Sequence, residues 1–259
     1  MSEQQDVIAE LGAAGILAGV RWAYESATRR ALETYSEPDG HDVAWLGNTR
    51  FTLFRDRLDR VFGCERYAPG PGDELDLDVL YAELSDEDIE SMPGLAPGLV
   101  RRCDLHGSPG WVYSGKRFLI ASGEFGRLDM LPWLSRSVTK RLVALQRDPE
   151  MRQPSLFESL DPDEISGLEA LLASDRELDL VTYVVGHSLD PFSGDVELVF
   201  GRPRLNAGGG QAWYWREDLR TVPLPARRRD GAAPVTFDPA WAPDAPVRLR
   251  RERRAGGER

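Results

Sequence analysis

Two stretches near the N-terminus carry apolar residues at helical spacing. Over residues 6–36 the apolar positions recur every three or four residues, and the Pro-Asp-Gly segment at 38–40 is typical of a helix end. Over residues 48–62 another apolar stripe has the same spacing, with Asn48 as the expected N-cap. Three arginines are expected to lie off this stripe: Arg50, Arg57 and Arg60. The pattern therefore predicts two N-terminal helices.

Shorter apolar runs farther along the chain predict strands. Residues 99–122 are typical of a hairpin or short meander that turns at Ser108–Gly110. Three more runs follow with short turns between them: 179–188, 195–200 and 211–216. Parallel pairing needs a connection of about a dozen residues, so these three strands are expected to pair antiparallel. The predicted fold class is α+β, with N-terminal helices and a mainly antiparallel sheet.

The composition divides the chain into a body and a tail. Residues 1–225 are expected to form a single compact α+β body, with further helices over 131–146 and 162–174 and a sub-boundary allowed near 147–160. Residues 226–259 are rich in Arg, Pro and Gly and are expected to form an extended or disordered tail. The last 40 residues hold ten arginines against five acids, so the tail is basic while the body is strongly acidic.

Net charge and apolar content narrow the function classes. A formal net charge of −11 disfavours a phosphate-rich partner, because nucleic acid is met by a cationic surface. The hydrophobic content of 41% is enough for a packed core. The longest apolar run has ten residues, Leu11–Val20, whereas a membrane span needs roughly 20. No membrane partner is therefore expected. The glycine run at 208–210 lacks the Lys-Ser/Thr pair of a phosphate-binding loop and Rossmann spacing is absent, so no cofactor is expected either.

The N-terminus and the cysteines favour a cytoplasmic protein. The first residues are acidic where a signal peptide would be basic. Two cysteines, Cys64 and Cys103, make no disulfide framework. Arginine greatly outnumbers lysine, since Lys116 and Lys140 are the only lysines, and this usage is typical of proteins from GC-rich bacterial genomes.

An acidic block occupies residues 73–90, with nine acids and no base. Leu75, Leu77 and Val79 alternate with acids, which predicts a half-buried strand. A helix is expected to start at Ser85, with acids in its first turn. The block is either a solvated surface or a docking surface for a basic protein partner. The acids expected to contact such a partner are Asp76, Asp78, Asp86, Glu87 and Asp88.

Two tryptophans lie in the last predicted strand. Strand alternation would direct Trp213 and Trp215 to one face and Tyr214 to the other. The pair would then either pack in the core or form an exposed binding platform, in which case it would belong to the same partner site.

A group of carboxylates offers an alternative, catalytic reading. Asp195 and Glu197 would share one face of a strand, with Asp190 just before it, and such carboxylates can hold Mg²⁺ in a metal-dependent hydrolase. His187 precedes them in the same region. The lysine that restriction-type nucleases place two residues after the glutamate is replaced by Val199. The alternative interpretation is a solvated strand face.

The segment Gly186–Asp190 comes close to the nucleophile elbow of hydrolases, with Ser188 as the nucleophile. Its last position is an Asp where a small residue is needed, and Pro191 follows where a helix should begin. No histidine follows Ser188 to act as its base. The sequence therefore favours a strand that runs into a turn.

Cys103 and His106 have the C-x-x-H spacing of half a zinc site. A second close pair of ligands, which structural zinc sites usually have, is absent from the sequence. No structural metal is therefore expected, and Cys103 is interpreted as a structural cysteine beside a surface histidine.

Three function classes follow from these patterns. The leading hypothesis is a non-catalytic binding or regulatory protein that engages a partner with a basic surface through its acidic face, in the manner of an antitoxin, immunity protein or adaptor. The second is a hydrolase with a site near Asp190, Asp195 and Glu197. The third is a nucleic-acid-associated factor that uses its Arg-rich tail; charge balance favours contact of the tail with acidic protein surface instead.

Overall fold

Three helices form the N-terminal part of the structure: α1 (Glu3–Ala13), α2 (Ile16–Thr34) and α3 (Val43–Val61). The first two replace the single helix expected over 6–36, and they meet at an angle of 75°. The break falls at Gly15, whose φ of +78° lies in the left-handed region that favours glycine. A Cβ at this position would lie 2.9 Å from a side-chain carbon of Leu95, so close packing also requires the glycine.

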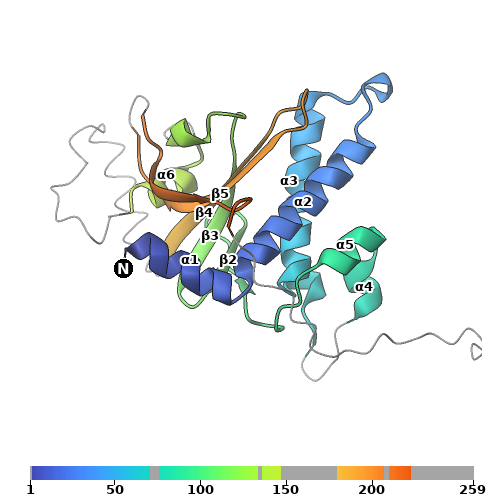
Figure 1. Ribbon diagram of the computed structural model, residues 1–259, viewed down its shortest axis with the longest axis horizontal. Coiled ribbons are helices and arrows are strands. Elements are labelled where there is room, and N and C mark those ends of the chain that lie inside the picture. The colour runs from blue at the N-terminus through green and yellow to red at the C-terminus, as the bar shows by residue number, and fades with distance from the viewer. Residues whose placement is uncertain (1, 71–75, 134–135, 147–179, 207–209, 223–259) are drawn as a thin grey trace, which may run out of the picture. The chain divides into compact units, whose positions relative to one another are not determined.

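Helix α3 begins earlier than expected. Its N-cap is Asp42, whose side chain accepts a 2.7 Å hydrogen bond from the backbone N–H of Trp45, and Asn48 lies inside the helix. The connection from α2 contains only the short helix η1 (Glu37–Asp39), so α2 and α3 form an antiparallel pair (Figure 1).

The computed structural model describes five stretches of the chain: 2–70, 76–133, 136–146, 180–206 and 210–222. All of them belong to one compact unit, residues 1–225. The basic segment 226–259, the expected helix at 162–174 and the expected sub-boundary near 147–160 lie outside the described residues. Among the described helices, none is by itself long and apolar enough to cross a membrane, although the bent pair α1–α2 would qualify on length and composition alone.

The sheet has six strands that follow one another in sequence order: β1 (Arg101–Arg102), β2 (Gly110–Tyr113), β3 (Lys116–Ser122), β4 (Val181–Leu189), β5 (Val196–Pro203) and β6 (Trp213–Asp218). Neighbouring strands are antiparallel except for β3 and β4, which are parallel. The antiparallel order predicted for the last three strands is confirmed, as is the α+β class. The parallel pair is possible because a long connection, 123–180, separates its strands.

Helices cover both faces of this sheet (Figure 1). On one face, α1, α2 and α3 pack on strand residues that include Phe118, Tyr183 and Phe200. On the other, η3 (Leu128–Met130) and α6 (Val138–Ala144) pack on a second apolar cluster around Leu119 and Val184. Alternate residues of each strand therefore enter different cores.

Three local expectations were wrong. The turn after β1 falls at His106–Gly107, where both residues have positive φ, and not at Ser108–Gly110. The helix expected over 131–146 is limited to α6. The alternating segment around Leu77 and Val79 is the short helix α4 (Leu77–Tyr81), because Asp76 caps it by accepting from the N–H groups of Asp78 and Val79. The remaining short helices are η2 (Glu65–Tyr67) and α5 (Asp86–Ser91), the latter starting after Ser85 as predicted.

Trp213 and Trp215 do not share a face. Trp215 is opposite Arg202 and Trp213 is opposite Pro203, so the register shifts by one residue between them, with Tyr214 as the extra residue of a β-bulge. Trp213 enters the core beneath η3 and α6, while Trp215 packs against the core beneath α1. The bulge therefore overrides the simple alternation expected from the sequence.

The close approach of β5 and β6 at this bulge gives a first prediction. A Cβ at Gly201 would lie 2.4 Å from the carbonyl oxygen of Trp215 and 2.9 Å from a ring carbon of Trp213. Gly201→Ala should lower the free energy of unfolding by about 1–3 kcal/mol, measured by urea denaturation. Gly12→Ala in α1 is the control, because nothing lies within 4 Å of that Cβ, and it should raise stability by about 0.5–1 kcal/mol. Equal midpoints for Gly201→Ala and the parent protein would contradict the geometry.

Candidate functional site

A cavity of about 540 Å³ opens where the carboxyl ends of the parallel strands β3 and β4 meet the first turns of α3. These three segments come together at the upper edge of the view in Figure 1. Apolar side chains line much of the cavity: Val43, Leu46, Phe125, Leu189 and Pro191. Four polar side chains also line it: Arg50, Ser122, Glu124 and Asp190. We call this cavity the Arg50 pocket.

The sheet topology fixes the position of the Arg50 pocket. Because β3 and β4 run in the same direction, with Ser122 opposite His187, both strands end at the same edge of the sheet. Ligands of sheets with parallel strands commonly bind beyond that edge. Helix α3 supplies the opposite wall, because Val43, Leu46 and Arg50 are spaced along one helix face. The volume is within the range typical of small-ligand sites.

Arg50 is the most unusual group in the pocket. Its side chain lies in the apolar interior, with 5% of the residue exposed, and its Nε and Nη1 atoms have no hydrogen-bond partner. The guanidinium lies 5.9 Å from the ring centroid of Tyr24, a weak compensation for lost hydration. Burial lowers the pKa of Arg50, yet an arginine side chain keeps its charge at neutral pH. A buried cation without a partner is costly, so the site favours an anion.

Another buried side chain near Arg50 also has polar atoms without partners. His187 is fully buried between the rings of Tyr24 and Phe54, at centroid distances of 5.6 and 5.3 Å, and neither of its ring nitrogens has a hydrogen-bond partner. Burial, reinforced by nearby positive charge including that of Arg50, lowers the pKa of His187 well below its usual range, so this imidazole is neutral. Buried polar atoms in proteins are nearly always hydrogen-bonded, which points to ligand or water in this region.

Tyr24 ties this polar region to β4. Its hydroxyl donates a 2.5 Å hydrogen bond to the carbonyl oxygen of Ser188. Desolvation raises the pKa of Tyr24, so the phenol stays protonated. The tyrosine therefore holds α2 on the strand next to His187.

The sequence drew attention to other residues and missed Arg50, which was expected off the apolar stripe of α3. In the structure Arg50, Arg57 and Arg60 are all buried. The stripe of α3 includes Leu46, Phe54 and Leu58, and Arg50 occupies the gap between the first two at helical spacing. An arginine in the middle of an apolar stripe was the available signal.

The predicted carboxylate site does not assemble. Asp190 and Asp195 each place a carboxylate oxygen 2.9 Å from Ser193 Oγ, so they share its single O–H donor and shape the β4–β5 turn. Glu197 accepts from Ser188 Oγ at 2.5 Å and from the N–H of Gly126 at 2.9 Å. Within the described stretches, no three His, Cys, Asp or Glu side chains are arranged to hold a metal ion. His187 lies on the opposite sheet face from Glu197, because β4 residues alternate.

The elbow and zinc motifs are also explained by structure. Ser188 is a buried strand residue, and β4 continues into an antiparallel hairpin where an elbow needs a helix. Cys103 is partly buried and accepts a 3.8 Å contact from Arg117 Nη1. His106 is exposed at the tight turn that follows β1.

The two tryptophans are structural. Trp213 is buried, donates a 2.7 Å hydrogen bond to the carbonyl oxygen of Leu128 and packs edge-on against Trp133. Trp215 donates a 2.9 Å hydrogen bond to Glu3, which also accepts from Tyr183 at 3.1 Å. These contacts use both indole N–H groups inside the protein, so the pair does not form one exposed platform.

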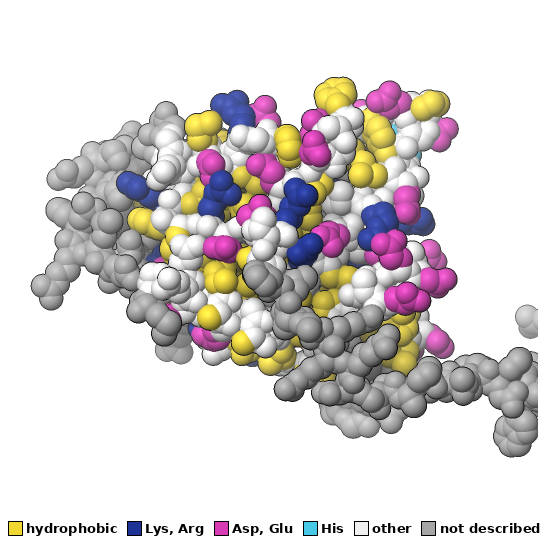
Figure 2. Space-filling view, in the orientation of Figure 1, with side chains coloured by type: hydrophobic (Ala, Val, Ile, Leu, Met, Phe, Trp, Pro, Cys, Tyr) yellow, Lys and Arg dark blue, Asp and Glu magenta, His cyan; other side chains and the backbone are white. Residues whose placement is uncertain are grey.

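The acidic segment lies on two short helices, α4 and α5. Asp76, Asp78, Asp86 and Glu87 are exposed, whereas Asp88 is buried. Figure 2 shows acidic side chains gathered over this end of the molecule, at the right of the view, with basic side chains beside them. On α2, Arg29 lies 2.7 Å from Glu87 and 3.5 Å from Asp88, which partly neutralises the segment.

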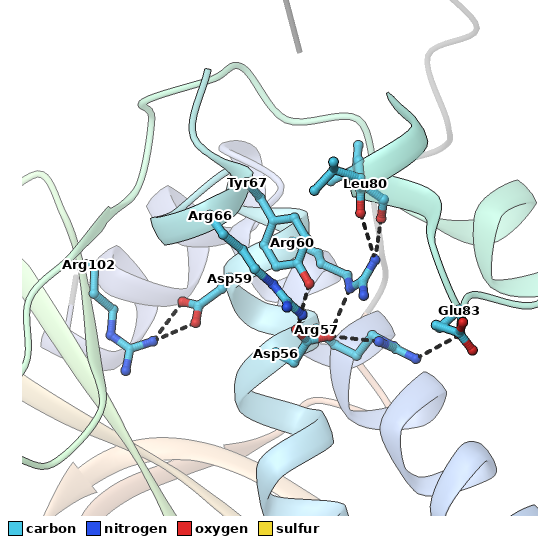
Figure 3. Close-up of polar contacts among 10 residues, drawn as sticks. Asp56, Arg57, Asp59, Arg60, Arg66, Tyr67, Leu80, Glu83 and Arg102 are labelled. Carbon is cyan, nitrogen blue, oxygen red and sulfur yellow. Dashed lines mark hydrogen bonds and ion pairs between the residues drawn. The ribbon is translucent and has the colours of Figure 1, made fainter. Parts of the chain in front are cut away.

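A hydrogen-bond network anchors this segment to α3 (Figure 3). Arg60 donates to the carbonyl oxygen of Leu80 at 2.5 Å, and Arg57 donates to that of Glu83 at 3.5 Å. Both arginines are oriented by Asp56, which accepts from each at 2.8 Å. Asp56 also accepts from two residues of η2, Arg66 and Tyr67, each at 2.6 Å. One carboxylate therefore holds α3, η2 and the acidic helices together.

The Asp56 network predicts a pH-dependent contribution to stability. Burial alone would raise the pKa of Asp56, but hydrogen bonds from Tyr67, Arg60 and Arg66 outweigh burial and lower the pKa to about 2. The folded-state pKa is below the unfolded value, so the stabilisation is present above about pH 4 and is lost as the pH falls towards 2. Asp56→Asn should lower the free energy of unfolding at pH 7 by about 2–4 kcal/mol. In urea titrations its difference from the parent protein should shrink between about pH 4 and pH 2.

Asp39→Asn, an exposed carboxylate in η1, is the control and should change stability by less than about 0.5 kcal/mol. A difference between Asp56→Asn and the parent protein that stays constant down to pH 2 would contradict the role given to the carboxylate.

Comparison with known proteins assigns no family. No family model matches the chain, and no curated protein or solved structure matches it either. The functional proposal therefore depends on the contacts of the Arg50 pocket and of the acidic segment.

Proposed function

We propose that this protein binds the anionic group of a ligand in the Arg50 pocket. The observation that carries the proposal is the buried guanidinium of Arg50, which lines a solvent-accessible cavity and has two nitrogens without hydrogen-bond partners. A carboxylate or phosphate would supply the missing countercharge and a hydrogen-bond acceptor for the guanidinium where it faces the cavity.

The remaining lining of the pocket supports binding of a partly apolar ligand. Leu46, Leu189 and Pro191 would contact its apolar part, and the Ser122 hydroxyl would be available near the carboxyl end of β3. The proposal assigns binding and no bond-making step to these residues. It includes a cytoplasmic location, which the two free cysteines support because disulfides are rare in that compartment.

Replacement of Arg50 tests this proposal, because function and stability should change in opposite directions. Arg50→Met keeps a long side chain but removes the unpaired charge, so the free energy of unfolding of the ligand-free protein should rise by about 1–3 kcal/mol. Benzoate, N-acetylglycine and inorganic phosphate serve as probes. At least one of them should raise the Tm of the parent protein, as ligand binding to the folded state requires. The shift should vanish in Arg50→Met, and calorimetry should confirm both results.

Two other arginines of α3 serve as matched controls. Arg57→Met removes an equally buried arginine that donates to Ser26 and Asp56, so it should destabilise the protein and keep the probe response. Arg55→Met, at an exposed position, should change neither property. Destabilisation by Arg50→Met, together with no Tm shift in the parent protein with any probe, would show that Arg50 is structural.

The acidic segment is a second candidate for function. Between its exposed acids it presents two exposed apolar side chains, Leu77, which is 52% exposed, and Val79. Acids around an exposed apolar centre match a basic amphipathic partner segment. We propose that α4 and α5 together bind a protein partner with such a surface.

A synthetic amphipathic helix, with lysines on one face and leucines on the other, tests whether the acidic segment binds a basic partner. It should bind the parent protein, and affinity should fall at least tenfold between about 50 and 500 mM salt, because exposed charges are screened. Leu77→Ser and the pair Asp78→Asn/Asp86→Asn should each weaken binding. The pair Asp39→Asn/Asp195→Asn, exposed acids elsewhere, is the control. Equal loss of binding with the control pair would reveal attraction to overall charge alone.

A further inference from the structure

The opening of the Arg50 pocket is bordered by exposed apolar side chains. Val43 at the start of α3 is 59% exposed, and Phe125 in the segment after β3 is 36% exposed. Both line the pocket. Phe192, the residue after Pro191 of the pocket wall, is 95% exposed at the tip of the β4–β5 hairpin. Exposed apolar residues of two chain segments thus line the pocket, and Phe192 is exposed next in sequence to its wall.

The hairpin tip holds Phe192 in this exposed position through its own hydrogen bonds. Asp190 Oδ1 accepts from the N–H of Phe192 at 2.9 Å, and Asp190 Oδ2 accepts from Ser193 Oγ at 2.9 Å. The backbone closes the turn, because the N–H of Asp190 donates to Asp195 and the N–H of Gly194 donates back to Asp190. These hydrogen bonds fix the conformation of the turn and hold Phe192 in a defined position, where its side chain contributes nothing to the packing of the core. Exposed aromatic side chains beside a pocket are typical of partner-binding surfaces.

We propose that the anion bound by Arg50 is the C-terminal carboxylate of a partner protein chain, whose preceding side chains pack on Val43, Phe125 and Phe192. This inference rests on the proposed function of the pocket and names its ligand. A small ligand inside the cavity would contact Arg50 but would leave the outward Phe192 uncovered. A chain that ends inside the cavity would cover both.

The burial of Arg50 below the opening of the pocket favours a chain terminus over an internal carboxylate. Arg50 is 5% exposed, so its partner has to enter the cavity and leave the solvent. An internal Asp or Glu would bring a main chain that continues in both directions past the opening. A C-terminal residue brings one chain only, and its carboxylate can pair with the part of the guanidinium that faces the cavity. Capture of a terminal carboxylate is a recurring mode of peptide recognition.

The test compares acetylated tetrapeptides that have an apolar third residue and end in each natural residue type. Each peptide is prepared with a free C-terminus and as its C-terminal amide, and N-acetylglycine is the small carboxylate. The parent protein should bind its best free-acid peptides at least about tenfold more tightly than N-acetylglycine, as burial of an aromatic anchor implies. The amides should not bind, because the charge that pairs with Arg50 is missing.

Variants separate the two contacts. Phe192→Ser should remove the advantage of the peptides, roughly a tenfold loss, and leave N-acetylglycine binding unchanged. Arg50→Met should abolish binding of both. Met130→Ser, at another exposed apolar position that does not line the pocket, is the control and should leave both affinities unchanged.

The outcomes distinguish this inference from the proposed function. Peptides that bind no more tightly than N-acetylglycine, or that bind equally well to Phe192→Ser, would overturn the chain-terminus proposal and leave the anion site standing. Amides that bind as well as the free acids would also overturn it. Absence of binding by every carboxylate and by phosphate would overturn the anion site and the chain-terminus proposal together.

Discussion

The parallel pairing of β3 with β4 is the contact on which the rest of the structure depends. Each of the other strand pairs joins neighbours across a short connection. The β3–β4 pair alone bridges a long separation in sequence, with Lys116 opposite Val181 and Ser122 opposite His187. It unites two antiparallel halves into one sheet, and only a sheet of that width offers α1, α2 and α3 a continuous apolar face. Parallel pairing also places two strand ends at one edge, where the Arg50 pocket opens.

Helix α3 shows two solutions for a buried arginine within a few turns. At its C-terminal half, Arg57 and Arg60 are buried and donate to Asp56 and to backbone carbonyl oxygens. At its N-terminal half, Arg50 is equally buried and has two nitrogens without partners. A buried charge is tolerated when it is paired and hydrogen-bonded, so the first pair fixes the acidic helices on α3. The second arrangement stores an unfavourable free energy that a bound anion would remove, as is common where binding and stability conflict.

Part of this structure could be predicted from the sequence, and the physical reasons separate the successes from the failures. The antiparallel pairing of β4, β5 and β6 follows from the length of the connections between them, which are too short for a crossover. The break at Gly15 depends on contact with Leu95, which is distant in sequence. The alternation around Leu77 was too short to outweigh the capping of a helix by Asp76. Residue type alone predicts a solvent-exposed Arg50, although its position between Leu46 and Phe54 places it on the buried face of α3.

Electrostatics set the two candidate sites apart. The chain has a net charge of −11, so its long-range field repels anions and attracts cations. The surface of α4 and α5 works with that field, and its exposed acids act through solvent, where salt weakens them. The same long-range field repels an anion from the Arg50 pocket. An anion can therefore be selected only by direct contact with Arg50, where the low polarity of the surroundings strengthens the ion pair once water has left. A ligand held by apolar contacts at the opening would be retained long enough to make that contact. The exposed Phe192 beside the pocket therefore complements the charge of Arg50, because it supplies an attraction that does not depend on the sign of the field.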